Sequence, residues 1–464
     1  MQSNWLVEIM KRAQSGPYMK EKDFELALIK RIRKLVKEYG IKYDANTLVP
    51  ADDDMADRVF EAGLQLFVEF GVYCQSTERQ ILFSRDEVVD LLAQARSSVV
   101  LGTGKDAVVM RHRGVEDPTP AIMLSGPTGT PASEKYHPLI LLSCAQEPLV
   151  DCLGAGSVST YLGENIIPGT PLEILGARRD ASVAREAVRM AGRPGMHISD
   201  VAVPLTCAGK MAAYDPAAGL RPSDGILVSQ MVELKTDFDQ LSRVAHLYNT
   251  GGITVDLMTP LLGGLGGRAE GTAVVSVADH ILGVVLYDAD YHMFSLTHLN
   301  WVNNTDPQGI WTQAMLGQAL SRNTPIILLN DIYTVSGAGA KELFYECAAG
   351  AIVGTVSGFN MQGAGCTGGF KMDVTTGLEA RFIAEVSRAS LGFTREQASE
   401  LIPEIMKGYM HTLDNPNRGK PFPENYDVET VQPKAEWLDM YFTAKEDLSN
   451  LGLNFPYAPR PVSS

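Results

Sequence analysis

The sequence lacks any run of eighteen consecutive apolar residues, and no basic segment followed by an apolar run opens it. A membrane-spanning helix needs about twenty such residues, so we expect neither a membrane-spanning nor an exported protein. The six cysteines are scattered, without the Cys-x-x-Cys spacing that is typical of zinc sites. They predict reduced core thiols and a cytoplasmic location.

Basic residues are also scarce. Lys and Arg together number 40 against 55 Asp and Glu, which gives a formal net charge of −15. Proteins that bind the phosphate backbone need clustered positive charge, so nucleic acid is excluded as a general partner.

Apolar content is ample, because 45% of the 464 residues are hydrophobic, and such a chain can bury a large core. From about residue 104, short apolar runs alternate with helical patterns. The clearest strand candidates are 107–110, 121–124, 253–257, 282–286, 326–329 and 352–356. The clearest helices are 175–191, 233–248, 269–281, 310–322, 338–349 and 377–391.

This alternation predicts an α/β protein whose parallel strands are covered by helices. A closed (β/α)8 barrel and an open doubly wound sheet both fit the pattern. We expect an N-terminal helical extension (1–100), a barrel (101–412) and a C-terminal arm with a final helix (413–464), all in one integrated domain.

The most informative segment is AGRPGMHISD, residues 191–200. It follows a helical stretch that a glycine and a proline terminate, so an exposed loop is predicted to begin there. Together with 101–108, 126–131, 228–235, 375–381 and 426–431, this segment resembles the archaeal monomethylamine methyltransferase family, in order and at similar spacing. In that family this loop carries pyrrolysine, and this sequence has Ser199 at the position.

The resemblance implies a β/α barrel that moves a methyl group from an amine to the Co(I) corrinoid of a separate corrinoid protein. It also implies a homo-oligomer, expected to be a hexamer. No covalently bound cofactor is expected. The segment Asp290-Tyr-His292 partly resembles the signature of corrinoid-carrying domains, but Ser295 replaces its glycine.

The missing pyrrolysine changes the expected substrate, because a serine cannot form the imine adduct with the amine. The resemblance places Leu227 and Leu257 where the family has glutamates, and Ile332 and Thr334 where it has a glutamine and a tyrosine. The polar shell is therefore predicted to be lost. A monomethylamine-like substrate stays possible, and so does a quaternary or higher methylated amine, which needs no covalent activation.

Candidate site residues lie where barrel enzymes keep their chemistry, at the carboxyl ends of strands. Asp256, Asp331 and Tyr333 are predicted to bind and balance a cationic amine. Ser199 and His197 share the special loop, and Tyr291, His292 and Trp301 could complete the substrate site. Ser199 lacks the local base that a nucleophilic triad needs.

Parts of the sequence also fit other functions. Gly264, Gly266 and Gly267 fit the loose dinucleotide pattern G-x-G-x-x-A, and the amides of such a loop could bind a nucleotide or another anion. Asp288, Asp290 and His292 could hold a metal, but a hydrogen-bonded pair that orients His292 is favoured, and no metal site is predicted. A barrel enzyme of other chemistry and a silent homologue that binds a corrinoid protein are the alternatives.

Overall fold

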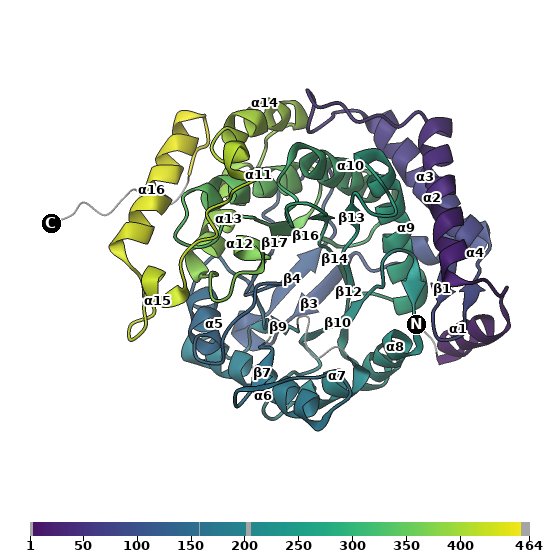
Figure 1. Ribbon diagram of the computed structural model, residues 1–464, viewed down its shortest axis with the longest axis horizontal. Helices are drawn as coiled ribbons and strands as arrows, with labels where there is room; N and C mark the ends of the chain where they lie inside the picture. Colours follow the sequence, from purple (N-terminus) through teal and green to yellow (C-terminus); the bar gives the residue numbers. More distant parts are fainter. Residues whose placement is uncertain (1–2, 157, 201–205, 456–464) are drawn as a thin grey trace.

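In the computed structural model, which describes residues 3–156, 158–200 and 206–455, eight parallel strands close into a barrel (Figure 1). In spatial order around the barrel they are β10 (Gly225–Ser229), β12 (Ile253–Met258), β14 (Tyr291–Phe294), β16 (Leu328–Tyr333), β17 (Asn360–Gly365), β5 (Met123–Ser125), β6 (Cys152–Gly154) and β9 (His197–Ser199). The expected closed α/β barrel is confirmed.

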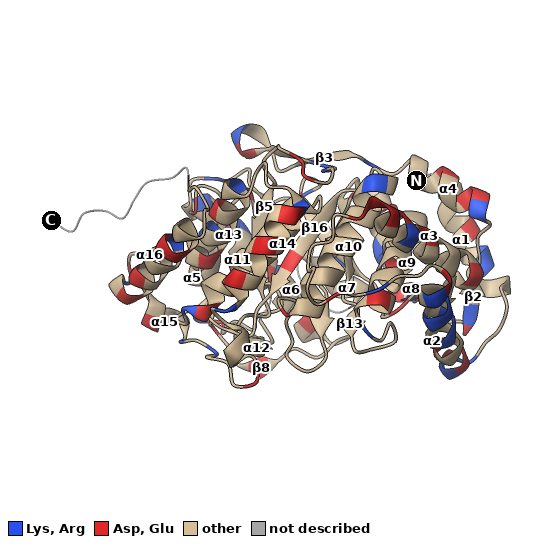
Figure 2. Cartoon of the chain, turned by 90° about the horizontal axis from the view of Figure 1, so that it is seen from above, with Lys and Arg blue, Asp and Glu red and all other residues tan. Residues whose placement is uncertain are grey.

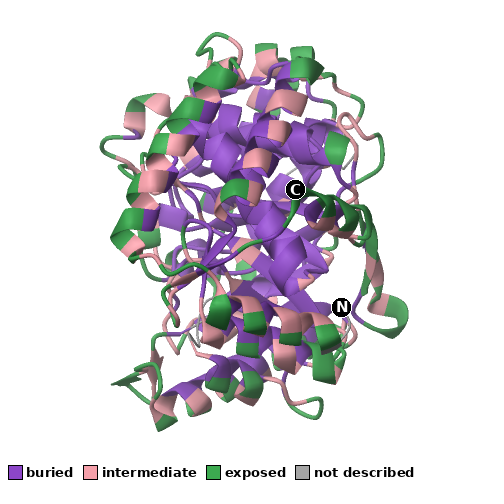
Figure 3. Cartoon of the chain, turned by 90° about the vertical axis from the view of Figure 1, so that its right-hand side faces the viewer, coloured by how far each residue is buried: buried purple, intermediate pink, exposed green. Residues whose placement is uncertain are grey.

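A helix follows each barrel strand and covers the outside of the barrel (Figure 1). These helices are α5 (His137–Ala145), α6 (Pro171–Met190), α7 (Cys207–Ala213), α8 (Phe238–Thr250), α9 (Ala269–Tyr287), α10 (Pro307–Asn323), α11 (Glu342–Val356) and α13 (Gly377–Ala389). In α9 a window of 18 residues is apolar enough to cross a membrane, but 94% of it is buried inside the protein. Figure 3 shows the buried core enclosed by partly exposed helices.

Further helices flank the barrel at both ends of the chain (Figure 1). The N-terminal group is α1 (Ser3–Ser15), α2 (Glu21–Glu38), α3 (Asp53–Phe70) and α4 (Arg85–Ala93), and the later group is α14 (Arg395–Met406), α15 (Phe422–Asn425) and α16 (Ala435–Asn450). The short helix α12 (Thr367–Phe370) instead lies within the ring of outer helices, directly after β17. Helix α3 packs on α9 and α10. The indole of Trp5 in α1 donates a hydrogen bond to the carbonyl of Val285 in α9, at 2.9 Å.

Short strands outside the barrel form small sheets. They pair as β1 (Val72–Cys74) with β2 (Arg79–Ile81) and β11 (Lys235–Thr236), β7 (Thr160–Tyr161) with β8 (Glu164–Asn165), β13 (Leu261–Leu262) with β15 (Thr297–His298), and β18 (Tyr426–Asp427) with β19 (Gln432–Pro433).

An antiparallel hairpin closes the amino-terminal floor of the barrel. Its strands are β3 (Ser98–Leu101) and β4 (Val108–Arg111), and the amides of Gly102 and Thr103 bond to carbonyls just before β10 and β9. Leu101 and Met110 pack with lumen residues of the barrel strands. Because the floor and lower lumen are filled, the open chemistry lies at the carboxyl ends of the strands, called the mouth below.

Two predicted strands are wrong. Residues 282–286 lie in α9 and residues 352–356 lie in α11. Both helices are buried almost all round, so their apolar runs lack the polar face that would distinguish a helix from a buried strand. Residues 107–110 lie in the floor hairpin rather than in the barrel wall.

Several barrel strands are absent from the prediction because they are short or carry small and polar residues. The strand β9 reads His-Ile-Ser and β17 reads Asn-Met-Gln-Gly-Ala-Gly. The segment predicted to be an exposed loop therefore contains a strand, His197–Ser199, whose three residues are fully buried.

Candidate active site at the barrel mouth

Two predicted site residues, Asp331 and Tyr333, lie at the end of β16 and face the lumen. Residues two apart on a strand share a face, and Leu329, which precedes them on that face, packs in the lumen cluster. The side chain of Asn304 fixes the end of this strand: its amide donates to the Asp331 carbonyl at 2.7 Å and its oxygen accepts from the Tyr333 amide at 3.0 Å.

The Asp331 carboxyl is buried, 2% exposed, and only partly hydrogen bonded. Ser295, after β14, donates its hydroxyl to Oδ2 at 2.9 Å, whereas Oδ1 has no partner among the described residues. Burial raises the pKa of Asp331 to about 7, although the hydrogen bond from Ser295 opposes the shift. The carboxyl therefore changes charge near neutral pH.

The neighbouring strand β17 brings a second unpaired acceptor to the same place. Gln362 is the register partner of Asp331, so the two Cα atoms lie about 5 Å apart. Met361 packs outward against Gly354 of α11, which turns Gln362 inward. Its Oε1 is buried without a described partner. Unpaired buried acceptors cost free energy, so a ligand that donates hydrogen bonds fits here.

Small residues make room around this pair. A Cβ atom on Gly365 would lie 2.7 Å from the Tyr333 ring and 2.9 Å from Asp331 Oδ1. A Cβ on Gly129 would lie 2.7 Å from the Cys366 thiol. Burial and the nearby Cys366 and Asp331 hold the pKa of Tyr333 well above its usual value, so its phenol stays neutral.

Ser295, Gln362, Gly365 and Cys366 were missed from the sequence. Recognising Asn360–Gly365 as a strand would have found Gln362 by alternation. No apolar run marks that strand.

The prediction that Ile332 and Thr334 face the substrate is wrong. Ile332 packs outward, because a Cβ on Gly350 of α11 would lie 2.6 Å from its side chain. The hydroxyl of Thr334 bonds to the carbonyl of Ser336. The polar shell is therefore retained on this strand as Asp331 and Tyr333. In contrast, Leu227 and Leu257 pack with the apolar lumen cluster, so that part of the wall is apolar.

Ser199, His197 and Tyr291 form a second polar cluster in the lumen. The Tyr291 hydroxyl donates to Ser199 Oγ at 3.3 Å and lies 3.2 Å from His197 Nε2. His197 Nδ1 lies 2.8 Å from the Ser223 carbonyl, and burial lowers the pKa of the imidazole. All three side chains are buried, and His197 is therefore neutral near pH 7.

Asp256 and His292 face away from the lumen. Asp256 Oδ2 lies 3.0 Å from His292 Nδ1, and both side chains press on Gly283 of α9. Gln230 also donates to both oxygens of Asp256 at 2.9 Å. Strand alternation therefore places this pair behind the barrel wall, where it joins β12 and β14 to α9 rather than contacting substrate.

The aromatic residues that the sequence offers for a cation site, Tyr291, Phe294, Trp301, Trp311 and Tyr333, do not assemble into one cage. Tyr333 lies at the mouth and Tyr291 deeper in the lumen. Trp301 lies on the rim, stacked on His298 at 4.4 Å with its indole donating to Asp414 at 3.0 Å. Phe294 packs against His280 and Phe359, and Trp311 of α10 packs against Tyr43.

The glycine loop after β13 lies against a buried carboxyl of the protein itself. The backbone amides of Leu261 and Gly266 bond to the carboxyl of Glu233, whose burial raises its pKa to about 7. Gly264 and Gly267 are engaged in turns of the same loop. The loop amides predicted to bind a nucleotide phosphate therefore serve the buried Glu233.

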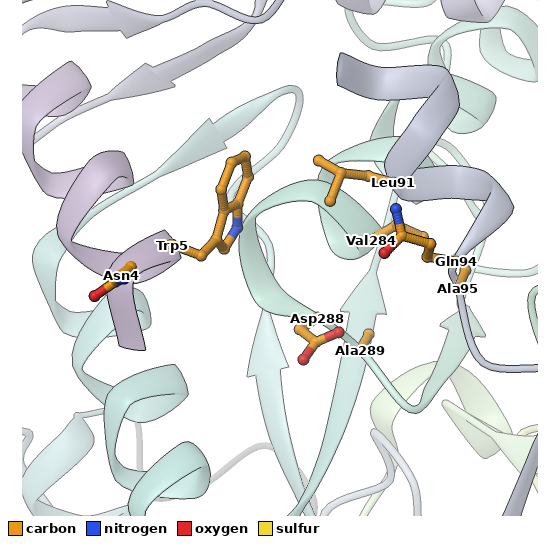
Figure 4. Close-up of a pocket in the computed structure, with 8 residues that line it drawn as sticks. All are labelled: Asn4, Trp5, Leu91, Gln94, Ala95, Val284, Asp288 and Ala289. Carbon is orange, nitrogen blue, oxygen red and sulfur yellow. The ribbon is translucent and has the colours of Figure 1, made fainter. Parts of the chain in front are cut away.

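Asp288 and Asp290 lie at the floor, not at a carboxyl end, because the predicted strand before them is part of α9. Both pair with Arg96, and the described residues contain no cluster of metal-ligating side chains. A hollow of about 560 Å³ opens beside Asp288, on the side of the protein away from the mouth (Figure 4). It is lined by Asn4, Trp5, Leu91, Gln94, Ala95, Val284, Asp288 and Ala289.

Replacing Gly365 by alanine is expected to lower kcat/KM about 10- to 100-fold and the free energy of unfolding by about 1–3 kcal/mol. The added methyl group must displace the Tyr333 ring or Asp331, and misplacement by about 1 Å can cost that much in rate. Gly114→Ala is the control, since a Cβ there meets nothing within 4 Å. Full turnover by the Gly365 variant would show that the space between Gly365, Tyr333 and Asp331 does not belong to the active site.

The chain is similar to proteins of known activity over nearly its whole length. A profile of the family described as "Monomethylamine methyltransferase MtmB" matches residues 5–453. Monomethylamine methyltransferase MtmB3 of Methanosarcina barkeri is 33% identical over 96% of this chain and 97% of its own. MtmB of Methanosarcina mazei is 32% identical over the same shares. Crystal structures of the M. barkeri enzyme and of a hydroxylamine MtmB complex superpose with TM-scores of 0.93 at 32% identity, covering 97% of this chain and 98% of theirs.

Proposed function

The chain belongs to the monomethylamine methyltransferase family, and from this premise we propose that it transfers a methyl group from a small primary methylammonium ion to the Co(I) corrinoid of a separate protein. The unpaired acceptors Asp331 Oδ1 and Gln362 Oε1 carry the proposal. They occupy paired register positions of β16 and β17.

A primary methylammonium ion matches these acceptors because its nitrogen carries three N–H donors and a positive charge. A quaternary amine carries no N–H donor and would leave both acceptors unpaired, at about 1–3 kcal/mol each. Recognition of quaternary ammonium also favours aromatic cages, and the predicted aromatic residues are dispersed. Among relatives, one protein forms a hydroxylamine complex, and hydroxylamine likewise presents N–H groups.

The residues of the chain bind and orient the donor. Ionised Asp331 and the Gln362 carbonyl accept hydrogen bonds from the ammonium. The neutral Tyr333 ring lies beside Asp331, next to Gly365. When the C–N bond breaks, nitrogen keeps the electron pair and leaves as neutral ammonia. The reduced corrinoid supplies the nucleophilic Co(I) that accepts the methyl group. A hexameric assembly belongs to this proposal through the family resemblance, and a cytoplasmic location belongs to it through the six scattered cysteines.

The test is a panel of mono-, di-, tri- and tetramethylammonium donors with a reduced corrinoid acceptor, followed by the Co(I) to methyl-Co(III) spectral change. We expect methylammonium to exceed tetramethylammonium by at least about 30-fold in kcat/KM, the effect of two unpaired acceptors at about 1 kcal/mol or more each. Preference for the quaternary donor would contradict the proposal. Binding of the acceptor protein without turnover of any donor would instead identify a silent homologue.

Replacing Gln362 by leucine is expected to lower kcat/KM for methylammonium about 10- to 100-fold while leaving the free energy of unfolding unchanged or slightly higher. The variant loses one acceptor for the substrate and removes a buried unpaired oxygen from the free enzyme. Gln94→Leu, on the exposed end of α4, is the matched control. Unchanged kinetics of the Gln362 variant would exclude that side chain from substrate binding.

A further inference from the structure

One buried carboxyl group connects two segments that lie next to the proposed site. Glu346 lies in the second turn of α11 and is 0% exposed. Its Oε2 accepts the Thr305 hydroxyl at 2.9 Å and the Val335 amide at 3.0 Å, and its Oε1 accepts the Ser336 amide at 3.0 Å. Thr305 lies between β14 and α10, whereas Val335 and Ser336 lie between β16 and α11. The carboxyl group therefore joins segments that follow two neighbouring strands of the barrel.

Both segments are attached to the strand end that carries Asp331 and Tyr333. Val335 is two residues beyond Tyr333. Thr305 directly follows Asn304, and the Asn304 side chain bonds to the Asp331 carbonyl and the Tyr333 amide. The Asn304 amide also donates to the Tyr333 carbonyl at 3.3 Å. Because these bonds join the segments to β16, a shift of either segment would move Asp331 and Tyr333 as well.

The polar network around Glu346 continues into α10. The Asn303 side chain donates to the Thr305 hydroxyl at 3.1 Å, and Gln313 of α10 donates to the Asn304 carbonyl at 2.5 Å. Four members of the network are 0% exposed, namely Asn303, Asn304, Thr305 and Gln313. A polar network at this depth is rigid where its groups are paired. The carboxyl group of Glu346 thus completes a network that fixes the mouth end of β16.

A carboxyl group at this position of α11 is costly if packing is its only role. Charged residues are frequent on outer helices such as α2 and α16 (Figure 2), whereas almost all of α11 is buried. An apolar side chain of similar size would avoid the desolvation of a carboxyl group. Without Glu346, however, the Thr305 hydroxyl and two backbone amides would be buried donors without this acceptor. The carboxyl group therefore serves the geometry of the two segments.

We propose that Glu346 is a positioning residue for methyl transfer: it fixes the end of β16 so that the Asp331 carboxyl and the Tyr333 ring face the donor. This inference depends on the proposed function. Both oxygens of Glu346 bind groups of the chain itself, so Glu346 acts through Asp331 and Tyr333 rather than on the methyl group. Misplacement of reacting groups by about 1 Å can cost about 100-fold in rate, which sets the size of the expected effect.

The test is Glu346→Gln in the full chain, alone and combined with Asp331→Asn. Glutamine keeps the size of the side chain, but its amide nitrogen would face a donor where an oxygen now accepts. Glu379→Gln is the matched control, because Glu379 is also 0% exposed and accepts the Thr376 amide. That pair lies against the outer helix α16, from which Trp437 donates to the Thr376 hydroxyl at 3.2 Å. Urea unfolding of each variant is measured beside kcat/KM for methylammonium.

We expect Glu346→Gln to lower kcat/KM about 10- to 100-fold. Glu379→Gln should stay within about twofold of the wild type, although both variants lose a buried acceptor and both lower the midpoint of urea unfolding. In the Asp331→Asn background, Glu346→Gln should cost less than about threefold, because the effects of residues that act as a unit are not additive. An equal loss in both backgrounds would overturn the positioning role.

A milder pair of variants covers the case in which Glu346→Gln does not fold. Thr305→Val removes the hydroxyl that Glu346 accepts, whereas Thr305→Ser retains a hydroxyl. We expect Thr305→Val to lower kcat/KM about 3- to 10-fold, the effect of one lost hydrogen bond, and Thr305→Ser to keep the wild-type value. Equal rates of the two variants would overturn the positioning role. Full activity of Asp331→Asn would contradict the proposed function and this inference with it, whereas an inactive Asp331→Asn beside a fully active Glu346→Gln would overturn this inference alone.

Discussion

Replacing Asp331 by asparagine is expected to lower kcat/KM for methylammonium about 100- to 1000-fold while the protein stays folded. The carboxylate is the charged group that faces the proposed ammonium site, and losing one partner of a buried charge pair costs about 2–5 kcal/mol. Asparagine keeps the size of the side chain and can still bond to Ser295. Asp427→Asn, at the exposed end of β18, is the control.

The acid limb of the pH profile provides a second measurement on the same variant. Because the pKa of Asp331 is about 7 in the free protein, the carboxylate needed to bind a cation forms only as pH rises through that value. The wild-type kcat/KM is therefore expected to rise about tenfold per pH unit below 7 and to level off above it. The Asp331→Asn variant should lose this limb, and an unaltered limb would assign the titration to another group.

The same substitution is expected to stabilise the protein at neutral pH. The pKa of Asp331 in the folded protein is raised above its ordinary value of 3.8, because the buried site favours the protonated carboxyl. The stabilisation by this protonated form is complete below about pH 4 and is lost as pH rises towards 7. A shift of about three units corresponds to roughly 4 kcal/mol at most. The excess Tm of the variant over the wild type should grow between pH 4 and 7, which differential scanning calorimetry can measure.

Replacing Arg185 by alanine is expected to lower the free energy of unfolding by about 3–5 kcal/mol. Arg185 of α6 pairs with Asp224, whose side chain is 1% exposed, and burial lowers the pKa of this guanidinium. Asp224 also accepts the amides of Ile198 and Arg221 at 2.9 and 2.8 Å. Removing the arginine leaves a buried carboxylate without its counter-ion, the costly way to break such a pair.

Helix α6 supplies a matched control in Arg178→Ala. Arg178 pairs with Asp215 at 2.8 Å, but its side chain is 53% exposed, and pairs of this kind contribute about 0–1 kcal/mol. Urea unfolding of both variants should separate them by at least about 2 kcal/mol. Because Asp224 bonds to Ile198, next to Ser199, the Arg185 variant should also lose activity. Equal midpoints for the two variants would contradict the buried pair.

The sequence predicted Asp331 and Tyr333 correctly as strand-end residues, because both follow a clear apolar run that is buried as a parallel strand. It could not predict that Asp256 and His292 face α9. Which face of a strand points into the barrel depends on register with its neighbours, and a shift of one residue exchanges the two faces. The family resemblance likewise placed Ile332 and Thr334 in the substrate site, one residue away from their lumen-facing neighbours Asp331 and Tyr333.

The sequence by itself determined the α/β class, the absence of a basic surface for nucleic acid, and the family, through motifs spread over most of the chain. These properties depend on composition and local order, which the linear chain records directly. Only the tertiary structure decided that Gln362 lies beside Asp331 and that the glycine loop lies against the buried Glu233 carboxyl. Each of these depends on contacts between segments far apart in the chain, which barrel closure creates and no local pattern encodes.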